Sequence, residues 1–227
     1  MLRTIDSGQC QTDNATVTVY RDANGADKLE DDNRKSVNDA MNGEYEPTDL
    51  TIDIVETYVG SGGSETDIVF QETTVGGGPG GTIGYTWCND PSDVFECDQF
   101  FVQMEAQYFG KGLACHEGGH AIGLAHGADA SSGPGIGNSV WGCMRTPFSS
   151  SYTDLGANQV ANINSEDWWR SWTRPGSGSL VEQLRRLCWQ EASVSRSRRG
   201  MKARGRTQLQ SWVKPRIAQP VGRQVTG

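Results

Sequence analysis

The amino-acid sequence predicts an α+β fold, in which a five-stranded sheet carries one helix between its first two strands and another after its last strand. Two observations lead to this prediction. Five short runs rich in β-branched and aromatic residues are each bounded by Gly, Pro, Asp or Ser, as strands usually are. Residues 28–42, by contrast, place apolar side chains among many charged ones at the spacing of an amphipathic helix.

Each element is expected from its own pattern. The strands are predicted at residues 16–20, 50–55, 67–71, 83–87 and 100–104. Gly43 and Pro47 are expected to end the helix of residues 28–42. The run GGGPGG at residues 76–81 predicts a mobile loop, because it lacks the Lys-Ser/Thr pair of a phosphate-binding loop and precedes a strand instead of a helix.

Charge divides the chain into two parts. Residues 1–169 contain 7 Lys+Arg and 26 Asp+Glu, whereas residues 170–227 contain 13 Lys+Arg and 2 Asp+Glu. A chain of 227 residues is long enough for one domain with an appendage. We therefore predict a domain over residues 1–169 and a basic, disordered C-terminal extension over residues 170–227, with a short amphipathic helix at residues 180–189.

The most informative stretch is HEGGHAIGLAH, at residues 116–126, which fits H-E-x-x-H-x-x-G-x-x-H without a mismatch. Residues four apart share one face of a helix, so His116 and His120 would point at one spot. Gly123 is expected to end the helix in the left-handed conformation, so that His126 can join them. Three imidazoles leave one tetrahedral zinc position open, and Glu117 would lie beside the metal as a general base.

A pair of histidines on a helix is also found as a solvated or hydrogen-bonded surface feature. The whole chain has three histidines, however, and all three belong to this motif. Gly118 and Gly119 would also each disfavour the interior of a purely structural helix, by about 1 kcal/mol relative to alanine. Both facts favour a metal site.

The motif resembles the active-site helix of the metzincin zinc proteases, and is most similar to that of small secreted bacterial members of their matrixin-like branch. Met144, in GCMRTP, resembles the methionine of the tight turn beneath the zinc in this family. The resemblance covers about residues 10–169. It implies a twisted, mostly parallel five-stranded sheet, an active-site helix near residues 111–123 and a small lower subdomain.

Further features of the predicted domain follow from the resemblance, which gives the edge strand, and from the residues themselves, which give a loop and a last helix. Residues 83–87 become the candidate edge strand, which would pair with an extended substrate. Residues 127–138 would form a loop leading to the methionine turn. Residues 154–169 would form the last helix, with Asp154 as its N-cap.

The resemblance implies a secreted zinc-dependent endopeptidase with one catalytic Zn²⁺, in which zinc-activated water attacks the peptide bond and Glu117 is the general base. Gly123 and Met144 would support the metal site. The chain departs from the family pattern in two ways. Thr146 stands where some members carry a tyrosine, and no further histidine remains for the second, structural zinc of matrixins.

Six cysteines, an even count, indicate an oxidising compartment. Cys88 and Cys97 are a candidate disulfide pair with C-x8-C spacing. No pairing is predicted for Cys10 or Cys188.

A second disulfide is predicted between Cys115 and Cys143, because these residues immediately precede His116 and Met144. It would tie the zinc helix to the methionine turn. Closing this loop, 29 residues counted inclusively, would contribute about 3 kcal/mol to stability. The alternative is a pair of buried free thiols.

The expected partner is a protein or peptide substrate, bound by a monomer. The N-terminal MLRTIDSGQC has no apolar leader segment, so a secretion signal is expected upstream of this start, and no run is apolar enough for a transmembrane helix. Nucleic acid is not expected as a partner, because basic residues gather only in residues 170–227. Calcium binding through carboxylates and carbonyls stays open. The rival function is a non-catalytic, zinc-containing binding protein of protease fold, whose basic tail binds polyanions.

Overall fold

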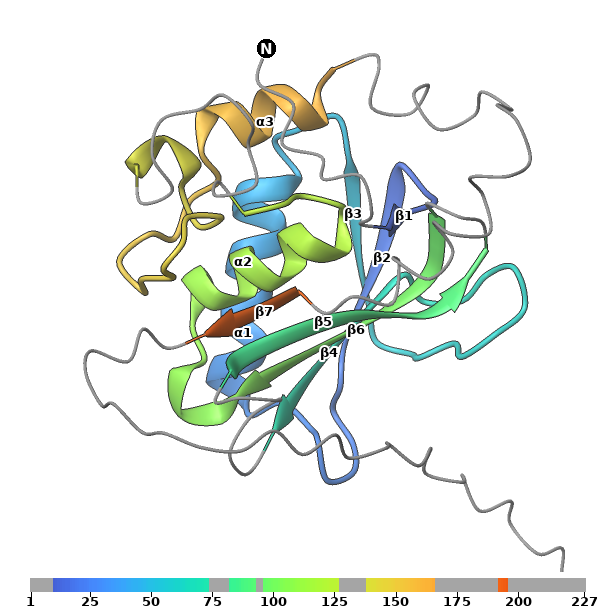
Figure 1. The fold of residues 1–227 in the computed structure, drawn as a ribbon. Helices are drawn as coiled ribbons and strands as arrows, with labels where there is room; N and C mark the ends of the chain where they lie inside the picture. The colour runs from blue at the N-terminus through green and yellow to red at the C-terminus, as the bar shows by residue number, and fades with distance from the viewer. Residues whose placement is uncertain (1–9, 74–81, 93–95, 127–137, 166–191, 196–227) are drawn as a thin grey trace, which may run out of the picture. The chain divides into compact units, whose positions relative to one another are not determined.

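The computed structural model describes residues 10–73, 82–92, 96–126, 138–165 and 192–195, all within one compact unit, Met1–Ser197. Their strands form a seven-stranded sheet in the order β3-β2-β4-β6-β5-β7, with β1 also paired to β6 (Figure 1). The strands are β1 Gln11–Thr12, β2 Thr16–Arg21, β3 Thr51–Val55, β4 Ile68–Thr73, β5 Thr82–Pro91, β6 Glu96–Glu105 and β7 Ala192–Ser195.

The sheet is mostly parallel, as predicted. The pairs β1/β6, β2/β3, β2/β4 and β4/β6 are parallel, and β5 is antiparallel to both of its neighbours, β6 and β7. The prediction of five strands was too low, because β1 has only two residues and β7 lies in the segment that was expected to be disordered. The prediction that residues 83–87 form an edge strand is wrong, since β7 pairs along the outer side of β5.

All five predicted strands are present, with shifted ends. The largest differences are in β5 and β6, which each extend to ten residues. Their antiparallel pairing continues from Gly84↔Met104 to Pro91↔Cys97, beyond the apolar residues that mark a strand in the sequence. Backbone pairing with a neighbour, which no local pattern reveals, therefore sets their length.

The first helix, α1, covers Asp31–Ala40 and continues as a π-helix, η1, over Met41–Tyr45. The prediction that Gly43 ends the helix is therefore wrong. Tyr45 is fully buried, and its hydroxyl donates a hydrogen bond to the Cys115 carbonyl, 2.5 Å away. This long-range contact holds the extra turn against the low helix propensity of glycine.

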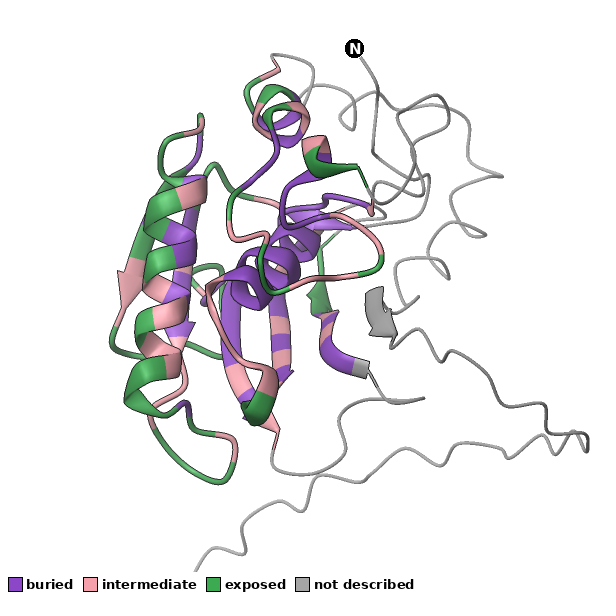
Figure 2. Ribbon diagram, turned by 90° about the vertical axis from the view of Figure 1, so that its left-hand side faces the viewer, coloured by how far each residue is buried: buried purple, intermediate pink, exposed green. Residues whose placement is uncertain are grey.

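The second helix, α2, covers Lys111–Ala121 and packs against α1, η1 and the inner face of the sheet (Figure 2). Val17, Val19, Ile68 and Phe70 form part of the buried core on this face. Gly118 of α2 faces both η1 and strand β4, since a Cβ there would lie 3.2 Å from Met41 Sδ and 3.5 Å from Phe70 Cζ. The absence of a side chain lets α2 approach closely.

Three shorter helices complete the described chain: η2 (Ala106–Tyr108), η4 (Ser139–Trp141) and α3 (Ala157–Ile163). The predicted helix of residues 154–169 is thus shorter, and its N-cap is Gly156 instead of Asp154. The Asp154 carbonyl accepts a hydrogen bond from the Cys143 amide, which keeps this part of the chain outside the helix. Residues 166–169, and the expectations for residues 76–81, 127–137 and 180–189, lie outside the described residues.

Two disulfides join pairs of cysteines that both lie in the described part of the chain, Cys88–Cys97 and Cys115–Cys143. The first joins β5 to β6, and the second joins α2 to the turn after η4. Cys10 is also disulfide-bonded, with a partner outside the described residues. No helix in the described part of the chain is long and apolar enough to cross a membrane.

The two disulfides should stabilise the fold to different extents. Removing Cys115–Cys143 by a double alanine substitution is expected to lower the free energy of unfolding by about 3 kcal/mol, and removing Cys88–Cys97 by about 1 kcal/mol less. The cause is loop entropy, because the bonded cysteines are 28 and 9 positions apart. Urea denaturation in the presence of a chelator measures the difference without a contribution from bound metal. Equal losses would contradict this explanation.

Candidate metal centre

Helix α2 brings His116 and His120 to one buried place. Both side chains lie on the same face of the helix, with relative exposures of 1% and 3%. The helix then ends in a Schellman turn, in which the Gly123 amide donates to the His120 carbonyl and the Leu124 amide to the Gly119 carbonyl. Gly123 has φ +96°, which favours glycine. The reversed chain carries His126 back toward the helix.

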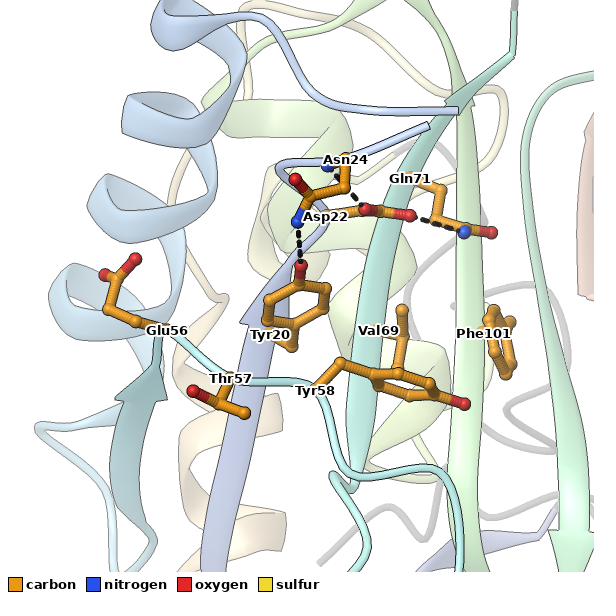
Figure 3. Close-up of a pocket in the computed structure, with 9 residues that line it drawn as sticks. All are labelled: Tyr20, Asp22, Asn24, Glu56, Thr57, Tyr58, Val69, Gln71 and Phe101. Carbon is orange, nitrogen blue, oxygen red and sulfur yellow. Dashed lines mark hydrogen bonds between the residues drawn. The ribbon is translucent and has the colours of Figure 1, made fainter. Parts of the chain in front are cut away.

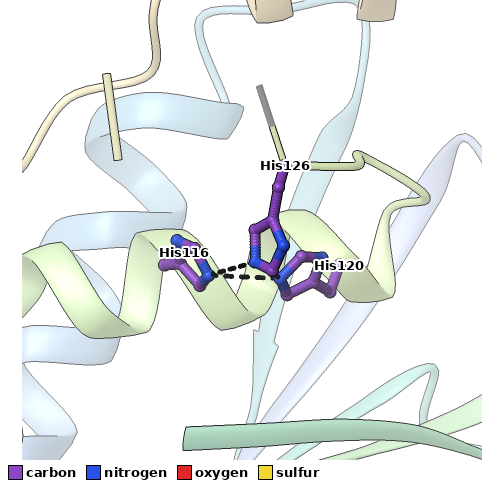
Figure 4. Close-up of side chains that lie close together, drawn as sticks. All are labelled: His116, His120 and His126. Carbon is purple, nitrogen blue, oxygen red and sulfur yellow. Dashed lines mark hydrogen bonds between the residues drawn. The ribbon is translucent and has the colours of Figure 1, made fainter. Parts of the chain in front are cut away.

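The three histidines converge through their Nε2 atoms (Figure 4). His126 Nε2 lies 3.0 Å from both His116 Nε2 and His120 Nε2, and the last two are 3.2 Å apart. Among the described residues, this is the one group of three or more His, Cys, Asp or Glu side chains close enough to hold a metal ion.

Hydrogen bonds made by the Nδ1 atoms determine whether the Nε2 atoms of His116 and His120 carry a proton. His116 Nδ1 lies 2.6 Å from the Cys143 carbonyl oxygen, and His120 Nδ1 lies 2.9 Å from the Leu124 carbonyl oxygen. A carbonyl only accepts, so both Nδ1 atoms carry the proton and both Nε2 atoms are bare lone pairs. The short contact between these two Nε2 atoms is therefore not a hydrogen bond. Lone pairs this close repel one another unless a cation lies among them.

The spacing fits a tetrahedral metal site. Zinc–nitrogen bonds of about 2.0–2.1 Å at tetrahedral angles place nitrogens about 3.3 Å apart, close to the observed separations of 3.0–3.2 Å. Neutral imidazoles suit zinc and other first-row metals, whereas calcium and magnesium prefer oxygen ligands. The residues present thus fit a three-histidine metal centre, without specifying which metal it holds.

Burial keeps the imidazoles in the form that binds metal. Desolvation, followed by the neighbouring His126, lowers the pKa of His116 to about 3. The same causes lower the pKa of His120 well below its usual range. Near neutral pH both rings are therefore neutral and ready to bind a metal.

Glu117 occupies a different environment beside the histidines. Its side chain is completely buried, and its Oε2 accepts a hydrogen bond from the Thr86 hydroxyl, 2.8 Å away. Oε1 has no hydrogen-bond partner. Burial raises the pKa of Glu117 to about 8, although the bond from Thr86 acts in the opposite direction. A carboxyl group with this pKa can take up or release a proton near neutral pH.

Two residues that hold Glu117 were not predicted from the sequence, Gly84 and Thr86 of β5. A Cβ placed on Gly84 would overlap Glu117 Oε1, so only glycine leaves room for the carboxyl group. A glycine inside a strand often marks a close approach by another group, and this signal was available in IGYTW. Nothing in the local sequence marks Thr86.

The turn after η4 forms the other wall of the centre. Met144 is fully buried, and a Cβ on Gly119 of α2 would overlap its sulfur atom. Cys143, the preceding residue, supplies both the carbonyl for His116 and the disulfide to α2. The ring of Phe148 lies edge-on to the His116 ring at 5.6 Å between centroids.

A separate pocket of about 370 Å³ lies on the face of the sheet opposite α2, over Tyr20, Val69 and Phe101 (Figure 3). Its polar groups bond mainly to one another and to Arg21. Gln71 donates to Asp22, and Glu56 pairs with Arg21. These contacts pair several of the polar groups that line the pocket.

No protein-family model matches the chain, and no match is found among curated proteins.

The close approach between Gly84 and Glu117 can be tested by a double-mutant cycle. Gly84→Ala is expected to destabilise the protein by about 1–3 kcal/mol, because the added methyl group displaces the Glu117 carboxyl group. The cost should disappear in a Glu117→Ala background. Gly110→Ala is the matched control, since a Cβ there meets no atom within 4 Å. Urea denaturation of wild type, the three variants of the cycle and the control measures these effects, and an equal cost in both backgrounds would refute the contact.

Because the pKa of Glu117 is raised, replacing its carboxyl group by a neutral amide should increase the stability of the protein by an amount that depends on pH. Its folded-state pKa of about 8 lies above the ordinary value of 4.5, so ionisation costs stability as the pH rises from about 4.5 to about 8. In metal-free protein, Glu117→Gln should therefore raise the melting temperature more at pH 8 than at pH 5. Asp53→Asn, on the exposed side of β3, should show no such trend. Thermal unfolding in chelator at both pH values checks this, and a gain that is the same at both would contradict it.

Proposed function

We propose that this protein is a secreted zinc-dependent endopeptidase. The observation that carries the proposal is the combination of three converging Nε2 atoms with the buried carboxyl group of Glu117, the residue next to the first ligand. Three nitrogen ligands and an open position are typical of catalytic zinc, whereas structural zinc has four protein ligands. The resemblance of residues 116–126 and Met144 to the metzincin proteases points to the same activity.

His116, His120 and His126 would hold the zinc ion. When bound, zinc would supply Lewis acidity, which lowers the pKa of water toward 7 and polarises the scissile carbonyl. The two backbone carbonyls behind His116 and His120 fix the ring orientations and tautomers before any metal arrives. The site needs little rearrangement on loading.

Glu117 is assigned the proton transfers. Its Oε1 has no partner, so this oxygen is free to accept the proton of the attacking water and to pass it to the leaving amine. Thr86 holds the other oxygen, Oε2, and so restricts rotation of the carboxyl group. Gly84 provides the space in which Oε1 lies. Strand β5 therefore positions the base.

The disulfides support an oxidising, extracellular location for the enzyme. Cys88–Cys97 and Cys115–Cys143 are both formed, and such bonds are rare in proteins of the reducing cytosol. Cys115–Cys143 also joins the two segments that hold His116. An oxidising compartment would thus keep the metal centre assembled.

A second candidate is a zinc-containing binding protein of the same fold that does not turn over substrate, in which the basic tail would bind polyanions. The near-complete burial of His116 and His120 favours this candidate, because histidines closed to solvent can hold a metal ion without offering it to a substrate. Measurement of turnover and metal content in the same samples separates the two functions.

The proposal predicts that purified protein binds one zinc ion and cleaves casein. Glu117→Gln should retain the zinc but lose at least about 100-fold in kcat/KM, because the proton acceptor is gone. His120→Ala should lose both zinc and activity, and Asp53→Asn should change neither. Activity removed by a chelator should return with zinc and not with calcium. Wild-type protein that holds one zinc ion yet cleaves no polypeptide would support the binding function instead.

A further inference from the structure

The outer side of β5 is occupied by a segment of the same chain. Strand β7, Ala192–Ser195, runs antiparallel to β5 with the register Thr82↔Ser195, Tyr85↔Ser193 and Thr86↔Ala192 (Figure 1). No other described strand pairs on this side. The β7 segment therefore adds one strand to the sheet beyond β5.

This pairing lies beside the candidate centre. The stretch of β5 that pairs with β7 contains Gly84 and Thr86, the two residues that contact Glu117. Glu117, His116 and His120 have relative exposures of 0%, 1% and 3%. A polypeptide bound along this part of β5 lies next to the proton acceptor.

Main-chain pairing with a strand edge is a general way to bind an extended polypeptide, since the hydrogen bonds do not depend on the side chains. We propose that Ala192–Ser195 is a self-inhibitory occupant of the β5 edge, which an extended polypeptide substrate must displace. This inference rests on the proposed function for its consequence on turnover, although the occupancy itself can be measured without turnover.

Two physical factors favour the internal occupant. A segment of the same chain pairs with β5 intramolecularly, so it competes with a free substrate without having to be recruited from solution. Opposite charge adds attraction, because residues 170–227 have an excess of 11 positive charges and residues 1–169 an excess of 19 negative charges. The apparent affinity for a substrate is then the intrinsic affinity multiplied by the fraction of molecules whose β5 edge is free.

The first test removes the strand pairing and keeps the chain intact. Adjacent residues of a strand direct their amide groups to opposite sides, so proline at both Ser193 and Val194 removes one donor that faces β5. Ser193→Pro/Val194→Pro is expected to raise kcat/KM for casein about 10-fold, as for an edge about 90% occupied. Ser193→Ala/Val194→Ala, which keeps the backbone donors, is the control and should match wild type. Measurable cleavage at the same rate by the proline variant and wild type, with equal zinc content, would overturn the proposal.

The second test measures occupancy without catalysis. A fluorescent peptide with the sequence of residues 190–197, QEASVSRS, is added to chains that carry Glu117→Ala, and binding is followed by anisotropy. The chain that also carries the two prolines should bind the peptide, and the chain with the alanine control should not. A peptide with proline at the same two positions should bind neither chain.

The two tests separate the failure of this inference from failure of the proposed function. Selective peptide binding by the proline variant, in a protein that never cleaves casein, supports the occupied edge and refutes the protease. Cleavage by wild type and the proline variant at the same rate, with no selective peptide binding, refutes the occupied edge and leaves the protease standing.

Discussion

The centre depends on two hydrogen bonds that fix the protonation of His116 and His120. Because their Nδ1 atoms donate to the Cys143 and Leu124 carbonyls, two bare Nε2 lone pairs face each other at 3.2 Å. This arrangement is costly without a cation, so the surrounding structure must hold it in place. The Schellman turn positions Leu124, and the disulfide to Cys115 positions Cys143. Two backbone carbonyls thus hold His116 and His120 in the tautomer that can bind a metal ion.

The second constraint is that α2 must lie close to the sheet and to the methionine turn, and glycines at the contact points allow this. Gly84, Gly118 and Gly119 each lie where a Cβ would press on Glu117, Met41 or Met144. Two of these glycines lie inside α2, where they disfavour the helix by about 1 kcal/mol each relative to alanine. Helix propensity is thus given up so that the helix can lie against the sheet and the methionine turn. Helix propensity is overridden at these positions by tertiary packing at the metal centre.

The sequence predicts best what local spacing determines. The C-terminal end of α2 and the meeting of the three histidines follow from helical geometry and from Gly123, and the five apolar runs mark their strands. The π-helix through Tyr45, the length of β5 and the pairing of β7 could not be predicted, because each depends on a contact between residues far apart in the sequence. Thr86 was missed for the same reason, since its partner Glu117 is 31 positions away.

Strand β5 combines two tasks that are usually considered separately. The absence of a side chain at Gly84 and the hydroxyl group of Thr86 set where the Glu117 carboxyl group lies, and the outer backbone of β5 pairs with an extended segment. Any polypeptide that pairs with this backbone is therefore placed in a fixed relation to the Glu117 carboxyl group. A shift of β5 would move the Glu117 carboxyl group and the paired segment together. The disulfide between β5 and β6 opposes such a shift.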